Sequence, residues 1–204
     1  MSDITLERLF RLQDDAAAHN VASSGRLARN LDFVRESVGL LAQILGSMDF
    51  AAPKQHTMRV LGVDAVTGIV TSVRVGLWGN LPEATVLLRS SLETGAILSA
   101  AVQANRYETI ASEIQAARLK RHSYKTSVKA LGDLGSRIDH LWGRLSEVGA
   151  HSTGTRLTFV SYKLNGEPFD RMAAAYDPEA AELALSMTPD VCLHLLKTCE
   201  VAYV

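Results

Sequence analysis

Apolar side chains recur along this chain at steps of three and four residues, the spacing that lines one face of an α-helix. The pattern is clearest between residues 26 and 49. The apolar positions of that stretch are Leu27, Leu31, Val34, Val38, Leu41, Leu45 and Met48. A seam sustained over this length predicts a long helix that packs against neighbours in a bundle.

The start of another helix is marked by capping residues. Asn80 can accept hydrogen bonds from first-turn amides, Pro82 lacks the amide proton that would be unpaired there, and Glu83 completes an N-x-x-E pattern. We expect this helix to continue through Gln103. The same periodicity predicts further helices over residues 3–20, 56–77, 107–131, 136–150 and 178–202, the last with a break at Pro189.

Residues 155–169, TRLTFVSYKLNGEPF, differ from the rest in composition. They are rich in β-branched and aromatic residues, and Asn165-Gly166 is a strong signal for a tight turn. Pro168 weakens the second arm, so we expect a short β-hairpin or an extended loop. The predicted fold class is therefore all-α: one up-and-down helical bundle over residues 1–204, with this excursion inserted.

Composition narrows the partners of such a bundle. The 204 residues carry a formal net charge of −1, so nucleic-acid binding would need a local basic patch. The N-terminus has no apolar signal region, and Asp64 and Arg74 interrupt the most apolar run, so we expect a cytoplasmic protein without a membrane partner.

Cys192 and Cys199 lie about 10 Å apart on a helix, too far for a disulfide. No spacing indicates a metal or a cofactor.

The segment GRLSEVGAH, residues 143–151, is the best candidate for chemistry. On a regular helix His140, Arg144, Glu147 and His151 fall within about 60° of one another. Histidine can act as a general acid or base, arginine suits phosphate oxygens, and Glu147 could orient the imidazole of His151. Together these groups could cleave a phosphodiester without metal, with the ribose hydroxyl as nucleophile.

Two alternatives stay open for this stripe of ionisable residues. Around the helix axis, the stripe lies roughly 100° from the centre of the predicted apolar seam, and small residues lie beside it. This position suits a cleft or a contact between two subunits. The stripe can equally be the solvated flank of an amphipathic helix. Gly149 can also end the helix as a C-cap, in which case His151 leaves the stripe.

Two other groups of charged residues are candidates for substrate binding. Arg89 and Glu93, in LLRSSLE, are spaced as an ion pair on one helix face: they either hold helices in register or face the same cleft as His151. Residues 116–130 contain a row of basic residues at steps of three and four, which could follow a phosphate backbone or serve only solvation. This row is Arg118, Arg121, His122, Lys125 and Lys129.

These motifs resemble the HEPN superfamily of helical-bundle proteins, in which an arginine is followed within a few residues by a histidine near a helix end. Arg144 and His151 match that motif, and Arg89 and Glu93 match an upstream LRxxLE-like helix of some bacterial branches. The resemblance covers about half the chain. It departs from the catalytic pattern at Leu145, where active members usually carry a polar residue.

The resemblance implies a homodimer with metal-independent endoribonuclease activity or with RNA or nucleotide binding. Such proteins serve in toxin–antitoxin or phage-defence systems, so a cognate antitoxin is an expected partner. The alternative interpretation is a non-catalytic bundle that mediates self-association or binds another protein.

Overall fold

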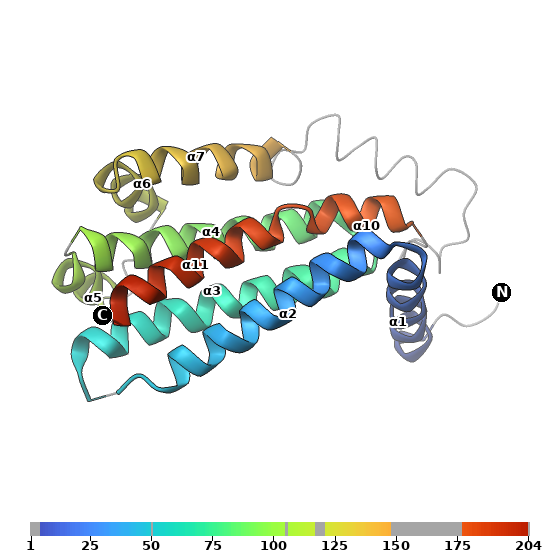
Figure 1. Cartoon of the computed structure of the whole chain (residues 1–204), viewed down its shortest axis with the longest axis horizontal. Helices are drawn as coiled ribbons and strands as arrows, with labels where there is room; N and C mark the ends of the chain where they lie inside the picture. The colour runs from blue at the N-terminus through green and yellow to red at the C-terminus, as the bar shows by residue number, and fades with distance from the viewer. Residues whose placement is uncertain (1–4, 50, 105, 117–120, 148–176, 204) are drawn as a thin grey trace.

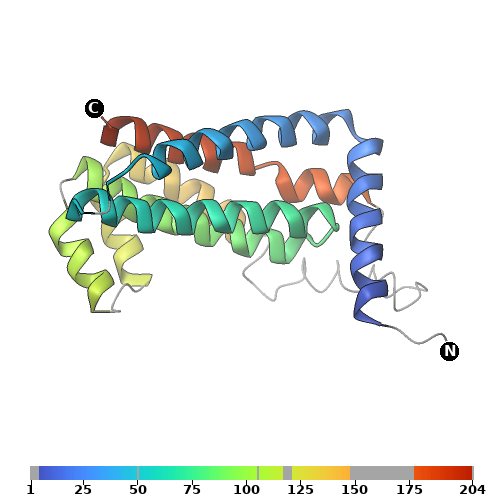
Figure 2. The ribbon, with the colours of Figure 1, turned by 90° about the horizontal axis from the view of Figure 1, so that it is seen from below.

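The computed structural model describes residues 5–49, 51–104, 106–116, 121–147 and 177–203, and every regular element in these ranges is helical. The long helices alternate in direction along the chain and pack side by side (Figures 1 and 2). The helices are α1 (Leu6–Ser23), α2 (Gly25–Gly46), α3 (Pro53–Leu77), α4 (Leu81–Gln103), α5 (Tyr107–Gln115), α6 (Arg121–Ala130), α7 (Asp133–Leu145), α10 (Pro178–Leu185) and α11 (Thr188–Tyr203). The expected all-α bundle is thus confirmed.

The predicted seam on α2 does form part of the core. Ser24 caps this helix by accepting from the amide of Leu27 at 3.0 Å. Five of the seven predicted seam residues are buried, and the other two are partly buried beside them. The buried ones are Leu27, Val34, Leu41, Leu45 and Met48. Burying such a stripe supplies most of the stability of a bundle helix.

Helices α3 and α4 pack with their backbones close together because small residues face each other. A Cβ atom added at Gly68 would lie 2.2 Å from Oγ of Ser91. The Ser72 hydroxyl donates to the carbonyl of Ala84 at 2.7 Å, which satisfies a buried polar group within the contact. This pair forms the centre on which the other helices pack.

Helix α11 lies along α4 and runs in the same direction, since Gly95 contacts Leu195 while Ser99 contacts Thr198 further along both helices. The Ser99 hydroxyl lies 3.1 Å from Nε2 of His194 and 2.7 Å from the Thr198 hydroxyl. Burial lowers the pKa of His194 to about 4, because the charged imidazolium would lose its hydration.

The two cysteines lie on the buried side of α11. Cys192 and Cys199 are free thiols, as the helical spacing predicted. Burial raises the pKa of the Cys192 thiol to about 12 and that of Cys199 to about 11. Both are therefore protonated, unreactive core residues at neutral pH.

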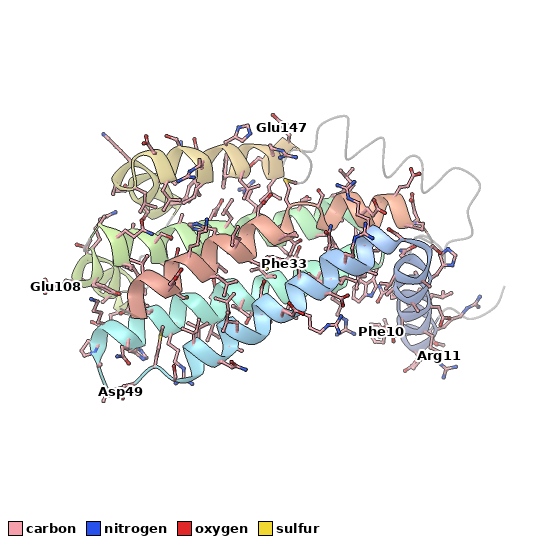
Figure 3. All side chains as sticks on the ribbon, in the orientation of Figure 1. Phe10, Arg11, Phe33, Asp49, Glu108 and Glu147 are labelled. Atoms are coloured by element: carbon pink, nitrogen blue, oxygen red, sulfur yellow. The ribbon has the colours of Figure 1, made fainter. Side chains whose placement is uncertain are left out.

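Helix α1 crosses the end of the bundle, and its first half projects away from it (Figures 1 and 3). The second half is held by polar contacts: the Asn20 side-chain amide donates to the carbonyl of Leu77 at 2.9 Å. The Ser24 hydroxyl donates to the Glu182 carboxylate of α10. In the projecting half Leu6 and Phe10 are 66% and 58% exposed.

Several predicted boundaries differ from the structure. The single helix expected over residues 107–131 is two helices, α5 and α6, with residues 117–120 outside the described part. Asn80 occupies the N-cap of α4 but makes no side-chain cap bond. Helix α11 starts just before Pro189, so the turn precedes that proline instead of falling on it. The predicted hairpin at 155–169 lies outside the described residues and stays a prediction.

Among the helices of the described ranges, α3 alone is long and apolar enough to cross a membrane by length and composition. Core helices of soluble proteins meet the same criterion. A third of the most apolar window of α3 is buried inside the bundle. Despite Asp64 and Arg74, α3 therefore meets the length and hydropathy of a membrane-spanning helix, which was not expected from the sequence.

Candidate functional site

Helix α7, which carries Arg144, is fixed against its neighbours by a tight turn and a close helix contact. Gly132 precedes α7 with a φ of +57°, a conformation that favours glycine. A Cβ atom on Gly135 would lie 1.9 Å from the backbone oxygen of Val128 in α6, so only glycine fits there. Ile138 and Leu145 are 3% and 0% exposed. The helix therefore begins at Asp133, three residues earlier than predicted, and its orientation is set along its length.

Arg89 and Glu93 on α4 form one polar and aromatic cluster with Trp142 on α7. Arg89 Nε donates to the Glu93 carboxylate at 3.1 Å, and the Trp142 indole N–H donates to the same oxygen at 2.6 Å. The Arg89 guanidinium lies over the Trp142 ring, 4.7 Å from its centroid. One carboxylate oxygen thus joins an ion pair on α4 to a side chain 49 residues further along. This is the geometry expected of a group that holds two helices in register.

Tyr124 on α6 extends the cluster to a third helix. Its ring stacks on Trp142 with 5.7 Å between ring centroids, and its hydroxyl donates to the Asp139 carboxylate at 3.3 Å. Burial, and then the nearby Asp139 carboxylate, raise the pKa of Tyr124 well above its usual range. The phenol stays protonated at any pH of interest and acts as a hydrogen-bond donor.

The other motif arginine, Arg144, lies on a different side of α7. It is two residues from Trp142, which places the two side chains about 160° apart around the helix axis. Arg144 is exposed, and so are His140 one turn earlier and Glu147 just past the helix end. Figure 3 shows Glu147 at that end of α7. The sequence placed this stripe at the border of the core, but the described residues place it on the outer surface.

The structure therefore separates the predicted site residues into two groups. Arg89 and Glu93 are largely covered, with 20% and 24% of their side chains exposed, and they contact Trp142. His140, Arg144 and Glu147 face outward on α7. His151 lies outside the described residues, so its place in the stripe stays a prediction. The α-helical part of α7 ends at Leu145 and continues as a π-helical turn through Glu147, and the predicted end at Ala150 lies outside the described residues.

The basic row on α6 is present in part. Lys125 and Lys129 are both exposed, one turn apart on the same helix face. Arg118 and the side chains of Arg121 and His122 lie outside the described residues. The two lysines give α6 an exposed positively charged surface beside α7.

One exposed residue was missed by the sequence reasoning. Arg137 is exposed on α7 and lies seven residues before Arg144, so the two guanidinium groups share a helix face. The spacing of two helical turns was a signal that could have found it. Arg137, His140 and Arg144 together make a row of nitrogen donors on the outer surface of α7, which we name the α7 basic face; the exposed acidic residues Asp133 and Glu147 lie on the same side, one at each end of the row.

No group of three or more His, Cys, Asp or Glu side chains within the described ranges could hold a metal ion. No protein-family model, curated protein or solved structure matches this chain. The site is therefore interpreted from its own geometry.

We expect Glu93→Ala to destabilise the protein by about 1–3 kcal/mol, because the Trp142 indole and the Arg89 guanidinium would both lose their common acceptor in a partly buried site. Urea unfolding would measure this loss. Glu36→Ala, on the exposed face of α2, is the matched control and should change stability by less than about 0.5 kcal/mol. Equal losses for the two variants would show that the cluster does not join α4 to α7.

Proposed function

We propose that this chain is an HEPN-like protein that binds RNA, with Arg144 as the principal phosphate contact. The observation that supports this most is the exposure of Arg144 in the last turn of an anchored helix. Because the backbone of α7 is fixed, only the side-chain torsions of Arg144 have to be ordered when its guanidinium binds a phosphate. Arg137 and His140 on the same surface add donors along a line that a backbone could follow.

The cluster of Arg89, Glu93 and Trp142 supports the assignment of Arg144, and not of Arg89, as the phosphate contact. Arg89 is engaged by Glu93 and stacked on Trp142, so it stabilises the helix that presents Arg144 and is not itself the anion contact. Leu145 is fully buried in the core. The position after the motif arginine therefore serves packing, and binding is favoured over cleavage as the basic activity.

Cleavage would require a general base, a role that the resemblance gives to His151, with Glu147 orienting it. The wider proposal is a cytoplasmic protein of a toxin–antitoxin or phage-defence type. The competing function is a non-catalytic bundle that mediates self-association or binds a second protein. Leu145, which replaces the polar residue of catalytic relatives, is the feature that favours it.

Fluorescence anisotropy with a labelled single-stranded RNA would test the proposal. We expect Arg144→Ala to weaken binding about 3- to 10-fold, because one charge-assisted phosphate contact is lost. Arg11→Ala is the matched control: it removes the same charge from the projecting half of α1 (Figure 3) and should leave the affinity unchanged. Absence of binding by the unaltered protein would overturn the proposal.

The same preparations decide whether RNA is cleaved. Incubation with total RNA in the presence of a chelator should give either intact RNA or metal-independent products. If products form and His151→Ala abolishes them while binding persists, the chain is an endoribonuclease. Intact RNA together with tight binding would indicate that the chain is a non-catalytic HEPN-like protein.

A further inference from the structure

The α7 basic face is short, and an acidic residue lies at each end of it. Arg137 and Arg144 are seven residues apart, with His140 between them, which separates the two arginines by about 10 Å along the helix axis. Asp133 lies about 6 Å before the first arginine, and Glu147 lies about 4.5 Å beyond the second. All five side chains are exposed, and their positions fall within about 80° around the axis. The charges along this side of α7 therefore run negative, positive, positive, negative.

Helix stability accounts for one of these two acidic residues but not for the other. Asp133 lies in the first turn of α7, where a negative charge interacts favourably with the helix dipole. Glu147 lies in the π-helical turn after Leu145, at the end where the same dipole favours a positive charge such as that of Arg144. Because Glu147 is exposed at an electrostatically unfavourable position, its charge acts mainly on what approaches α7 from outside.

A phosphate chain that followed α7 beyond either arginine would meet one of these carboxylates. Repulsion over about 6 Å is only partly screened at physiological ionic strength, where the Debye length is about 8 Å. The side of the row is different, because Ser136 and Gly143 lie next to it and carry no charge. A Cβ atom on Gly143 would have no atom of the described residues within 4 Å. A strand can therefore leave the face over this side without approaching a carboxylate.

We propose that Asp133 and Glu147 limit the RNA segment that the α7 basic face binds to about two or three phosphates of a single strand. The segment follows the helix from Arg137 to Arg144, where the two guanidinium groups contact its outer phosphates, and then turns away from α7. This limit rests on the RNA binding proposed above, and it makes the two acidic residues determinants of how much strand is bound.

The salt dependence of binding counts the phosphates in contact with cations. For a labelled single-stranded RNA of about 20 nucleotides, we expect the slope of log K against log salt to lie between about −1.4 and about −2.1, because each contact contributes about −0.7. Arg137→Ala should make the slope shallower by about 0.7. A slope steeper than about −2.1 for the unaltered protein would show that the strand continues past the acidic residues, and it would overturn the proposed limit.

Asp133→Asn combined with Glu147→Gln removes both carboxylates with little change in side-chain shape. We expect the affinity for the same RNA to rise about 3- to 10-fold at physiological salt, because the bound phosphates no longer lie near two negative charges. Glu7→Gln combined with Glu36→Gln is the matched control. It removes two exposed carboxylates from α1 and α2, which Figure 1 shows away from α7, and should raise the affinity less than about 2-fold. Equal gains for the two double variants would overturn the proposed limit.

Two further readouts keep the outcomes distinct. The thermal midpoint of the Asp133→Asn and Glu147→Gln double variant should stay close to that of the unaltered protein, because the two substitutions have opposite effects on the helix dipole interaction. An unaltered protein that binds no RNA would contradict the proposed function itself. Binding with a steep slope, or with equal gains in both double variants, would contradict only the limit set by Asp133 and Glu147.

Discussion

Gly135→Ala should destabilise this protein by about 3 kcal/mol, because the added methyl group would overlap the α6 backbone. Its Cβ atom would lie 1.9 Å from the carbonyl oxygen of Val128 and 2.8 Å from the carbonyl carbon. A backbone cannot rotate aside as a flexible side chain can, so α7 must move away from α6. That movement would also disturb the stacking of Trp142 on Tyr124. Denaturant unfolding followed by circular dichroism measures the loss.

Gly143→Ala is the control on the same helix. No atom of the described residues lies within 4 Å of a Cβ atom at this position. Because alanine favours the helix over glycine, stability should rise by about 0.5–1 kcal/mol. If both substitutions change stability in the same direction, the close contact between α6 and α7 is not as described.

Acidification should remove up to about 3 kcal/mol of stability through His194 alone. The pKa of this imidazole falls from 6.5 to about 4 in the folded protein because burial opposes its charge. In the unfolded chain the residue binds a proton near pH 6.5, so unfolding takes up a proton between these two values. The stability that depends on neutral His194 is fully present above about pH 6.5 and is lost as the pH falls toward about 4.

The free energy of unfolding measured at several pH values between 4 and 7 would show this dependence. His194→Gln keeps a hydrogen-bonding group for Ser99 but cannot titrate. We expect its unfolding free energy to fall less steeply with acid than that of the unaltered protein. Identical slopes for the two proteins would place the acid sensitivity elsewhere.

The sequence predicted the long helices well because their apolar spacing is a local property. The seam from Leu27 to Met48 packs in the core of the bundle, and α4 begins at Leu81 with Pro82 in its first turn, as expected. The break between α5 and α6 was missed because no Gly or Pro marks residues 115–121. The start of α7 was placed too late because the positive φ of Gly132, which sets it, is a property of the turn.

The candidate site was predictable only as separate pieces. Spacing paired Arg89 with Glu93, and helical periodicity grouped His140 with Arg144 and Glu147. Nothing local connects Glu93 with Trp142, because that contact joins residues far apart in the chain and depends on how α7 packs on α4. Trp142 lies under the guanidinium of Arg89 and, through its hydrogen bond to Glu93, joins α4 to the helix that carries Arg144.

The central claim is that RNA contacts the α7 basic face through Arg144. The salt dependence of binding to single-stranded RNA tests it most directly, since each phosphate contact releases a counterion. Arg144→Ala should reduce the slope of log K against log salt by about 0.7, and Arg11→Ala should leave it unchanged. A slope unaltered by Arg144→Ala would contradict the account.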